Sequence, residues 1–111
     1  MTSAKAKPGS QTPAEAACTR LAELSADLRG CAVLDSGGAV LASRGDWAAG
    51  APLLESEGAE NGERAPIDGG EAFVVRGDGL ALVAVAGRST LAELLLFDMR
   101  VALRAVAAGA A

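Results

Sequence analysis

The chain contains no histidine, and its two cysteines stand far apart, at Cys18 and Cys31. Histidine is the commonest general base near neutral pH and a common metal ligand, so its absence removes the simplest catalytic and metal sites. Two separated cysteines without histidine do not make a zinc site. We therefore predict a protein that is not an enzyme and that has no metal or other cofactor. Both cysteines fall in apolar patterns, which favours buried thiols over a disulfide.

Aromatic side chains are scarce, at 3% of residues, although 50% of the residues are hydrophobic. The core must therefore consist mainly of alanine, leucine and valine. A chain of 111 residues forms one domain with a modest core. Association with another surface is one way for such a domain to bury more apolar area.

Positive charge is also in deficit, since the formal net charge is −4 and the isoelectric point is near 4.7. Nucleic acid binding requires a basic stripe, so we expect no nucleic acid partner. Residues 1–13 lack the apolar centre of a signal peptide. The apolar runs at 80–86 and 91–97 fall short of the roughly 20 residues that span a bilayer. We therefore expect no membrane span and a cytoplasmic location.

Residues 1–11 are small and polar, which is typical of a disordered tail, and residues 12–111 form a single domain. A helix begins at Thr12, because Thr12 can cap it, Pro13 suits the first position and Glu15 completes a capping box. Apolar residues at helical spacing continue to Leu28, and Gly30 is the predicted helix stop.

A second, longer helix closes the chain, with Thr90 as its predicted cap and Glu93 as the capping-box partner. Its apolar residues cover most of the circumference, and its clean polar edge consists of Glu93, Arg100 and Arg104. A helix this apolar is covered on more than one side. The sheet can take one side, and the first helix or a second subunit can take another.

Asp98 falls on the apolar side of this last helix. A buried carboxylate must find donors. We predict a structural hydrogen bond to a backbone N–H or to Arg88, and the alternative is a polar anchor at an interface.

Five short strands are predicted between the helices, at residues 31–35, 39–43, 65–68, 71–76 and 80–86. Glycine turns at 36–38, 68–70 and 77–79 link them mostly as hairpins, so the sheet is antiparallel. These glycine turns lack the lysine and hydroxyl residues of a phosphate-binding loop, so we expect no nucleotide to bind. Residues 58–64 are acidic and glycine-rich, which indicates a loop.

A short middle helix follows Asp46 and begins near Trp47 or near Ala51, because Gly50 and Pro52 are poor interior residues. Its adjacent leucines, Leu53 and Leu54, point about 100° apart, so one can face the sheet and the other solvent.

The surface predicted to bind a second subunit or a partner consists of this segment, residues 47–57, together with the edge strand at Ile67. Trp47 is either a core residue or an interface hot spot. Glu55 and Glu57 would supply an acidic rim. The alternative is that both leucines, Leu53 and Leu54, are covered by their own subunit.

The order of elements resembles that of the roadblock/dynein light-chain domain family, including its small bacterial members. The segments that carry the resemblance are Leu21-Ala22-Glu23-Leu24, residues 30–42, and residues 80–106 with Phe97-Asp98-Met99-Arg100. The resemblance implies an α/β (α+β) fold of profilin-like layout. Its five-stranded antiparallel sheet has the first and last helices on one face and a short second helix on the other.

The resemblance also implies a homodimer whose third strands pair into a continuous sheet. The implied function is non-enzymatic regulation, commonly of small GTPases, or scaffolding of motor and signalling complexes. This chain departs from the family at Gly50 and Pro52, in the helix that builds the dimer and partner face of the family. A small-ligand sensor domain of profilin-like fold is the alternative, although an Ala/Leu/Val interior offers such a ligand few polar groups.

Overall fold

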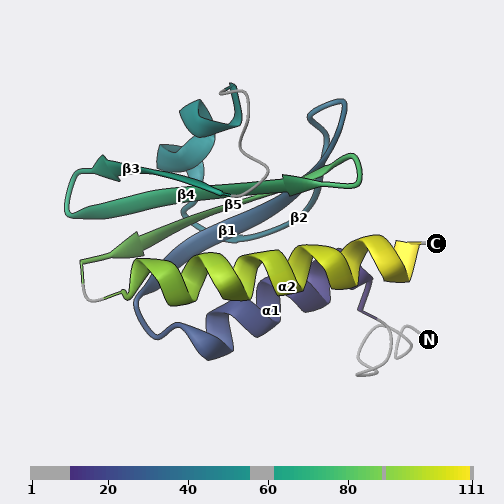
Figure 1. Ribbon diagram of the computed structural model, residues 1–111, viewed down its shortest axis with the longest axis horizontal. Coiled ribbons are helices and arrows are strands. Elements are labelled where there is room, and N and C mark those ends of the chain that lie inside the picture. The colour runs from purple at the N-terminus through teal and green to yellow at the C-terminus, as the bar shows by residue number, and fades with distance from the viewer. Residues whose placement is uncertain (1–10, 56–61, 89, 111) are drawn as a thin grey trace, which may run out of the picture.

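A computed structural model describes residues 11–55, 62–88 and 90–110 of the chain. Its elements in chain order are α1 (Pro13–Leu24), β1 (Leu28–Asp35), β2 (Val40–Gly45), η3 (Ala48–Glu55), β3 (Glu63–Ile67), β4 (Gly70–Gly77), β5 (Leu80–Gly87) and α2 (Ala92–Ala110). The strands form one antiparallel sheet in the order β2-β1-β5-β4-β3 (Figure 1). The predicted five-stranded antiparallel sheet is confirmed.

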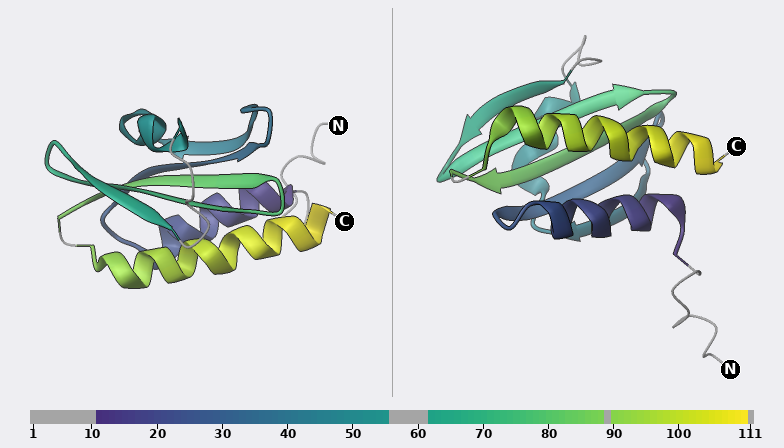
Figure 2. Two further views of the ribbon diagram at one scale, coloured as in Figure 1. Left: turned by 45° about the horizontal axis from the view of Figure 1, so that its top comes forward. Right: turned by 60° about the horizontal axis from the view of Figure 1, so that its bottom comes forward.

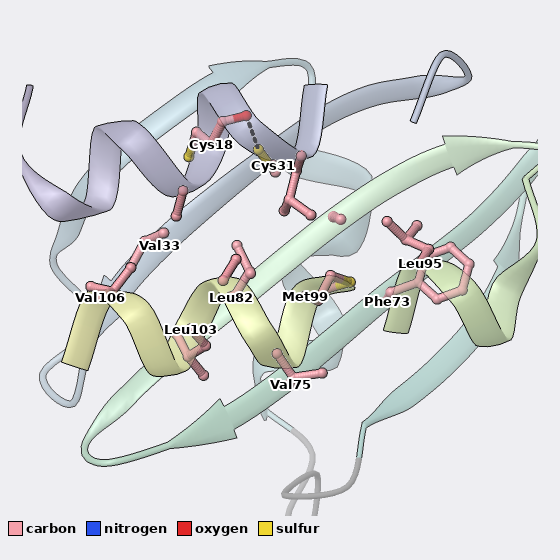
Figure 3. Packing of buried hydrophobic residues seen from close by; sticks show 14 of the residues in the cluster. Cys18, Cys31, Val33, Phe73, Val75, Leu82, Leu95, Met99, Leu103 and Val106 are labelled. Atoms are coloured by element: carbon pink, nitrogen blue, oxygen red, sulfur yellow. Dashed lines mark hydrogen bonds between the residues drawn. The ribbon is translucent and has the colours of Figure 1, made fainter. Parts of the chain in front are cut away.

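The domain has three layers, with α1 and α2 side by side on one face of the sheet and η3 on the other (Figure 2). The main core lies between the two helices and the sheet, around Phe73, Leu82 and Met99 (Figure 3). A smaller buried cluster under η3 consists of Ala32, Leu34 and Val83. The predicted placement of the first and last helices opposite the short middle helix is therefore confirmed.

The start of α1 follows the sequence prediction, but its end does not. The Glu15 backbone N–H donates to Thr12 Oγ1 at 3.1 Å, and the Thr12 N–H donates to Glu15 Oε1 at 2.9 Å. The helix then ends at Leu24, and Gly30 lies within β1, so the predicted helix stop at Gly30 is wrong. A Cβ at Gly30 would lie 2.5 Å from the Asp46 carbonyl carbon. This glycine therefore permits a close approach of two backbones.

The capping box predicted for α2 is also wrong. The helix begins at Ala92, and the first helical bond runs from the Leu95 N–H to the Leu91 carbonyl at 3.0 Å. The Thr90 hydroxyl is buried and has no hydrogen-bond partner among the described residues. The helix starts too late along the chain for Thr90 to reach its first turn, because Leu91 occupies the cap position.

The turn between β4 and β5 is built as the sequence predicts. Asp78 (φ 56°) and Gly79 (φ 77°) both adopt positive φ. Two successive residues of this kind are typical of the Asp-Gly turns whose twist matches a β-hairpin.

The middle helix differs from the prediction in type, and of the two predicted starts the one near Trp47 is correct. It is a 3₁₀ helix from Ala48 to Glu55 that contains Pro52. Strand β3 begins at Glu63, so part of the loop predicted over residues 58–64 is strand, whereas residues 56–61 lie outside the described part. Strand β1 begins at Leu28, three residues earlier than predicted, because Leu28 and Gly30 already pair with β5.

Candidate functional site

Helix η3 is tied to the sheet by one side chain of β4. Arg76 donates from Nη2 to the Leu53 carbonyl at 3.3 Å and also to the Leu54 carbonyl. Carbonyls at the end of a short helix have no partner within the helix, so a guanidinium in this position satisfies them. Arg76 therefore fixes the end of η3 against the face of the sheet.

A glycine allows the start of η3 to lie close to the sheet. A Cβ at Gly50 would lie only 2.7 Å from Val83 Cγ2. The Gly50 N–H donates to the Trp47 carbonyl at 2.9 Å, which begins the 3₁₀ turn. Gly50 weakened the sequence prediction of a helix, yet its lack of a side chain allows η3 to pack closely on β5.

The three predicted interface residues of this segment are all half-buried. Trp47 and Leu54 pack against the small cluster of Ala32, Leu34 and Val83. Leu53 is not part of that cluster, although it is the immediate neighbour of Leu54. The two leucines therefore have different surroundings. The rim residue Glu57 lies outside the described part.

Ile67 lies at the far edge of the sheet, where β3 pairs with β4 alone. It is half-buried and opposite Gly70. Next to it, Pro66 lacks a backbone N–H, and this costs least where the group would point away from β4. Arg64 Nε contacts Glu71 Oε2 at 3.2 Å across the same pair of strands. This edge of the sheet is unpaired in the described chain.

Asp98 lies on the opposite layer from η3. It is half-buried in a groove of about 210 Å³ between the end of α1 and the start of α2. The predicted bond to Arg88 or to a backbone N–H is absent, since Asp98 makes no hydrogen bond or ion pair with any described residue. The half-buried carboxylate of Asp98 therefore remains accessible to solvent in this groove.

The five predicted interface residues thus occupy three separate places: the η3 face, the β3 edge and the helical layer. The sequence predicts a further covering partner for the last helix, but none of the predicted site residues belongs to the exposed apolar surface on α2. Its residues and their exposed fractions are Leu91 (71%), Leu94 (55%), Phe97 (57%) and Val101 (40%). The signal was the apolar arc of the last helix, which is wider than the sheet and α1 can cover.

Cys18 and Cys31 are both free and buried, as the sequence predicts. The Cys31 thiol is 3.9 Å from the Cys18 carbonyl oxygen (Figure 3). The hydrogen bond between the two thiols raises the pKa of Cys31 well above its usual range, and burial adds to this shift. The same hydrogen bond lowers the pKa of Cys18, against the opposing effect of burial. Cys18 also lines a cavity of about 360 Å³ beside Arg44.

Among the described residues, no polar or charged residue is buried as a whole, although single polar atoms such as the Thr90 hydroxyl are, and no group of three or more potential metal ligands occurs. A cavity of about 460 Å³ lies between two of the hairpin turns and η3, with Asp35, Arg76 and Asp78 in its wall. None of the helices in the described part is long and apolar enough to cross a membrane.

No family known from its sequence pattern matches the chain, and no curated protein matches it in sequence. Solved structures do match. A roadblock/LC7 domain from Streptomyces avermitilis is 18% identical and superimposes with a TM-score of 0.66, covering 83% of this chain and 92% of that one. The chain has the roadblock/LC7 fold. This confirms the fold that the sequence resemblance implies.

Two further solved structures are similar to this chain over most of their length. MglB from Myxococcus xanthus is 16% identical with a TM-score of 0.68, and the match covers 89% of this chain and 95% of that one. The gliding protein MglB from Thermus thermophilus is 16% identical with a TM-score of 0.65, and the match covers 86% and 87%. The three matches therefore cover between 83% and 89% of this chain.

Proposed function

We propose that this chain is a non-catalytic, homodimeric regulatory or scaffold protein that binds a small GTPase or another signalling protein. The observation that carries the proposal is the unpaired edge of β3 beside the apolar, half-buried face of η3. An unpaired edge is a ready template for another strand. The roadblock fold supports the assignment, because the family that the sequence resembles is one of regulators and scaffolds.

In the proposed homodimer, β3 of one subunit lies antiparallel to β3 of the other. Strand β3 has only five residues, and Pro66 removes one backbone donor. Few hydrogen bonds are therefore available across the edge, and apolar contacts from η3 and Ile67 must supply most of the binding free energy. Leu53 is the residue of η3 best placed for this role, because it lies outside the buried cluster that holds Leu54.

The partner face is proposed to be the outer side of η3, with an apolar centre and an acidic rim. Glu55 is exposed at the end of η3, and Glu57 follows it in the sequence. Such a rim favours a partner with a basic patch and makes the association rate sensitive to salt. The net charge of −4 acts in the same direction.

A pair of substitutions tests the proposed surface. Leu54→Asp places a charge against the cluster of Ala32, Leu34 and Val83, so we expect it to destabilise or unfold the domain. Leu53→Asp should leave the domain folded but halve the mass measured by light scattering. Circular dichroism reports the fold of each variant.

Leu41→Asp is the matched control, because Leu41 is 45% exposed on β2, at the opposite edge of the sheet. It should remain folded and keep the parent mass. A Leu53→Asp variant that is folded and has the parent mass would show that η3 and β3 do not form the dimer interface. A parent chain that is monomeric in the micromolar range would contradict the homodimer itself.

The class of partner is tested by affinity capture from the source organism, with the parent and Leu53→Asp as paired baits. Mass spectrometry should find a small GTPase or signalling protein with the parent and much less of it with the variant. The GTPase proposal is wrong if the proteins enriched by the parent over the variant include no such protein.

A further inference from the structure

Helix α2 carries a continuous stripe of exposed apolar side chains along its outer side. The α2 stripe consists of Leu91, Leu94, Phe97 and Val101, which are between 40% and 71% exposed. The buried side chains of α2 point to the sheet and to α1. These side chains are exposed, so no other element of the described chain covers them fully.

The stripe continues onto the end of α1. Leu24 is 50% exposed and lines the same groove as Leu91 and Leu94. Five of the seven large hydrophobic residues that are exposed in the described chain therefore belong to one surface. An apolar surface of this extent is characteristic of a protein interface.

The chain contains no other segment suited to cover this surface. The residues outside the described ranges are 1–10, 56–61, 89 and 111, and Met1 is their only large apolar side chain. Residues 1–10 carry Lys5 and Lys7 and are otherwise small or polar. Residues 1–111 therefore supply no large apolar side chain to the stripe from outside the described ranges except Met1.

The charges beside the stripe match those of a second copy. Glu93 and Arg104 are exposed and eleven positions apart. They lie about 20° apart around the helix axis, hence on the same border of the stripe. They are roughly 16 Å apart along the axis. A second α2 in antiparallel orientation brings the same border of the two helices together, so Glu93 of each copy lies near Arg104 of the other. A parallel pair sets this border on opposite sides of the contact and does not make these two charge pairs.

The sizes of the side chains are complementary in the same orientation. The large members of the stripe lie at the start of α2, with Leu91 at the cap position and Leu94 and Phe97 in the first half of the helix. In the second half, the exposed outward positions include Ala105 and Ala108. An antiparallel copy therefore sets large side chains against small ones, which allows the two helices to approach closely.

We propose that the α2 stripe binds the α2 stripe of a second copy of this chain, in antiparallel orientation. This contact is two-fold symmetric, so each copy contributes the same surface. It lies on the opposite layer from η3, so it is separate from the β3 interface of the proposed function. Both contacts together would join four copies or more.

The first test is the loss of the apolar contact. Phe97→Asp puts a charge in the middle of the stripe, where the side chain is already exposed, so the domain should stay folded. We expect its mass by sedimentation velocity to be half that of the parent in the micromolar range. Leu41→Asp again serves as the control and should keep the parent mass.

The second test is a charge swap, which identifies both the occupant and its orientation. Glu93→Arg and Arg104→Glu should each weaken self-association roughly tenfold, because symmetry replaces two attractions with two repulsions. The double variant Glu93→Arg/Arg104→Glu restores opposite charges and should recover the parent affinity. A double variant as weak as the single ones would overturn the antiparallel arrangement.

The outcomes separate this inference from the proposed function. If Phe97→Asp keeps the parent mass, the stripe is not a self-association surface, and the β3 homodimer is unaffected. If it is monomeric, the α2 contact is supported and the β3 homodimer is wrong. If it is a dimer that Leu53→Asp then dissociates, both contacts are supported. Loss of GTPase capture at unchanged mass would assign the stripe to that partner and overturn our proposal.

Discussion

The buried thiols show how single residues of this domain differ despite their identical chemistry. Cys18 and Cys31 lie against each other between α1 and β1, yet their shared hydrogen bond moves the two pKa values in opposite directions. The thiolate is the reactive form of cysteine. The difference in pKa therefore predicts a difference in reaction rate.

We expect iodoacetamide to modify Cys18 before Cys31 in the folded protein at mildly alkaline pH. Cys18 lines the cavity beside Arg44, whereas the Cys31 side chain is fully buried. Peptide mass spectrometry at successive times gives the order. Cys31→Ala removes the hydrogen bond that lowers the pKa of Cys18, so it should slow the modification of Cys18. Faster labelling of Cys31 in the parent would contradict this assignment.

At the scale of elements, the parts that the sequence predicts correctly are those determined by their neighbours in the chain. The Thr12–Glu15 capping box and the Asp78-Gly79 turn need only a few consecutive residues. The failures depend on distant segments. Gly30 looks like a helix stop but accommodates the backbone of Asp46, which is sixteen positions away. Local patterns cannot reveal such an approach.

Gly50 provides the element-scale prediction. Gly50→Ala should destabilise the domain by roughly 1–3 kcal/mol, because its Cβ would overlap Val83 Cγ2. Urea denaturation measures the change. Gly77→Ala is the matched control, since no atom lies within 4 Å of a Cβ built there, and it should leave the stability nearly unchanged. Equal stability of the two variants would mean that η3 is not seated closely on β5.

At the scale of the whole molecule, the sequence predicts the layers correctly but not the surfaces. The antiparallel hairpins follow from the glycine turns, the two helical faces are implied by the resemblance to the roadblock family, and the pairing of β1 with β5 is not predicted. The candidate residues Trp47, Ile67 and Asp98 are separated because exposure depends on which neighbours cover each side chain. A helical wheel shows that α2 is too apolar for one partner, but only the packing of α1 and the sheet shows which side is left open.

The proposal of a non-catalytic protein is tested on the intact chain. Calorimetric titrations with GTP, ATP and zinc should give no binding heat. The reasons are the lack of histidine in the sequence and of a phosphate-binding loop. The described residues also contain no group of three potential metal ligands. A stoichiometric isotherm with any of these ligands would contradict the proposal and favour the ligand-sensor alternative.

The bonds of Arg76 to η3 affect how this domain would meet a partner. Arg76 belongs to β4, which is the strand next to the β3 edge, and its guanidinium holds the end of η3. The η3 surface and the sheet edge are therefore parts of one rigid body before any encounter. A preorganised surface loses little conformational entropy on binding. Binding would then be a rigid-body association. Its association rate would be limited by diffusion and charge rather than by folding of η3.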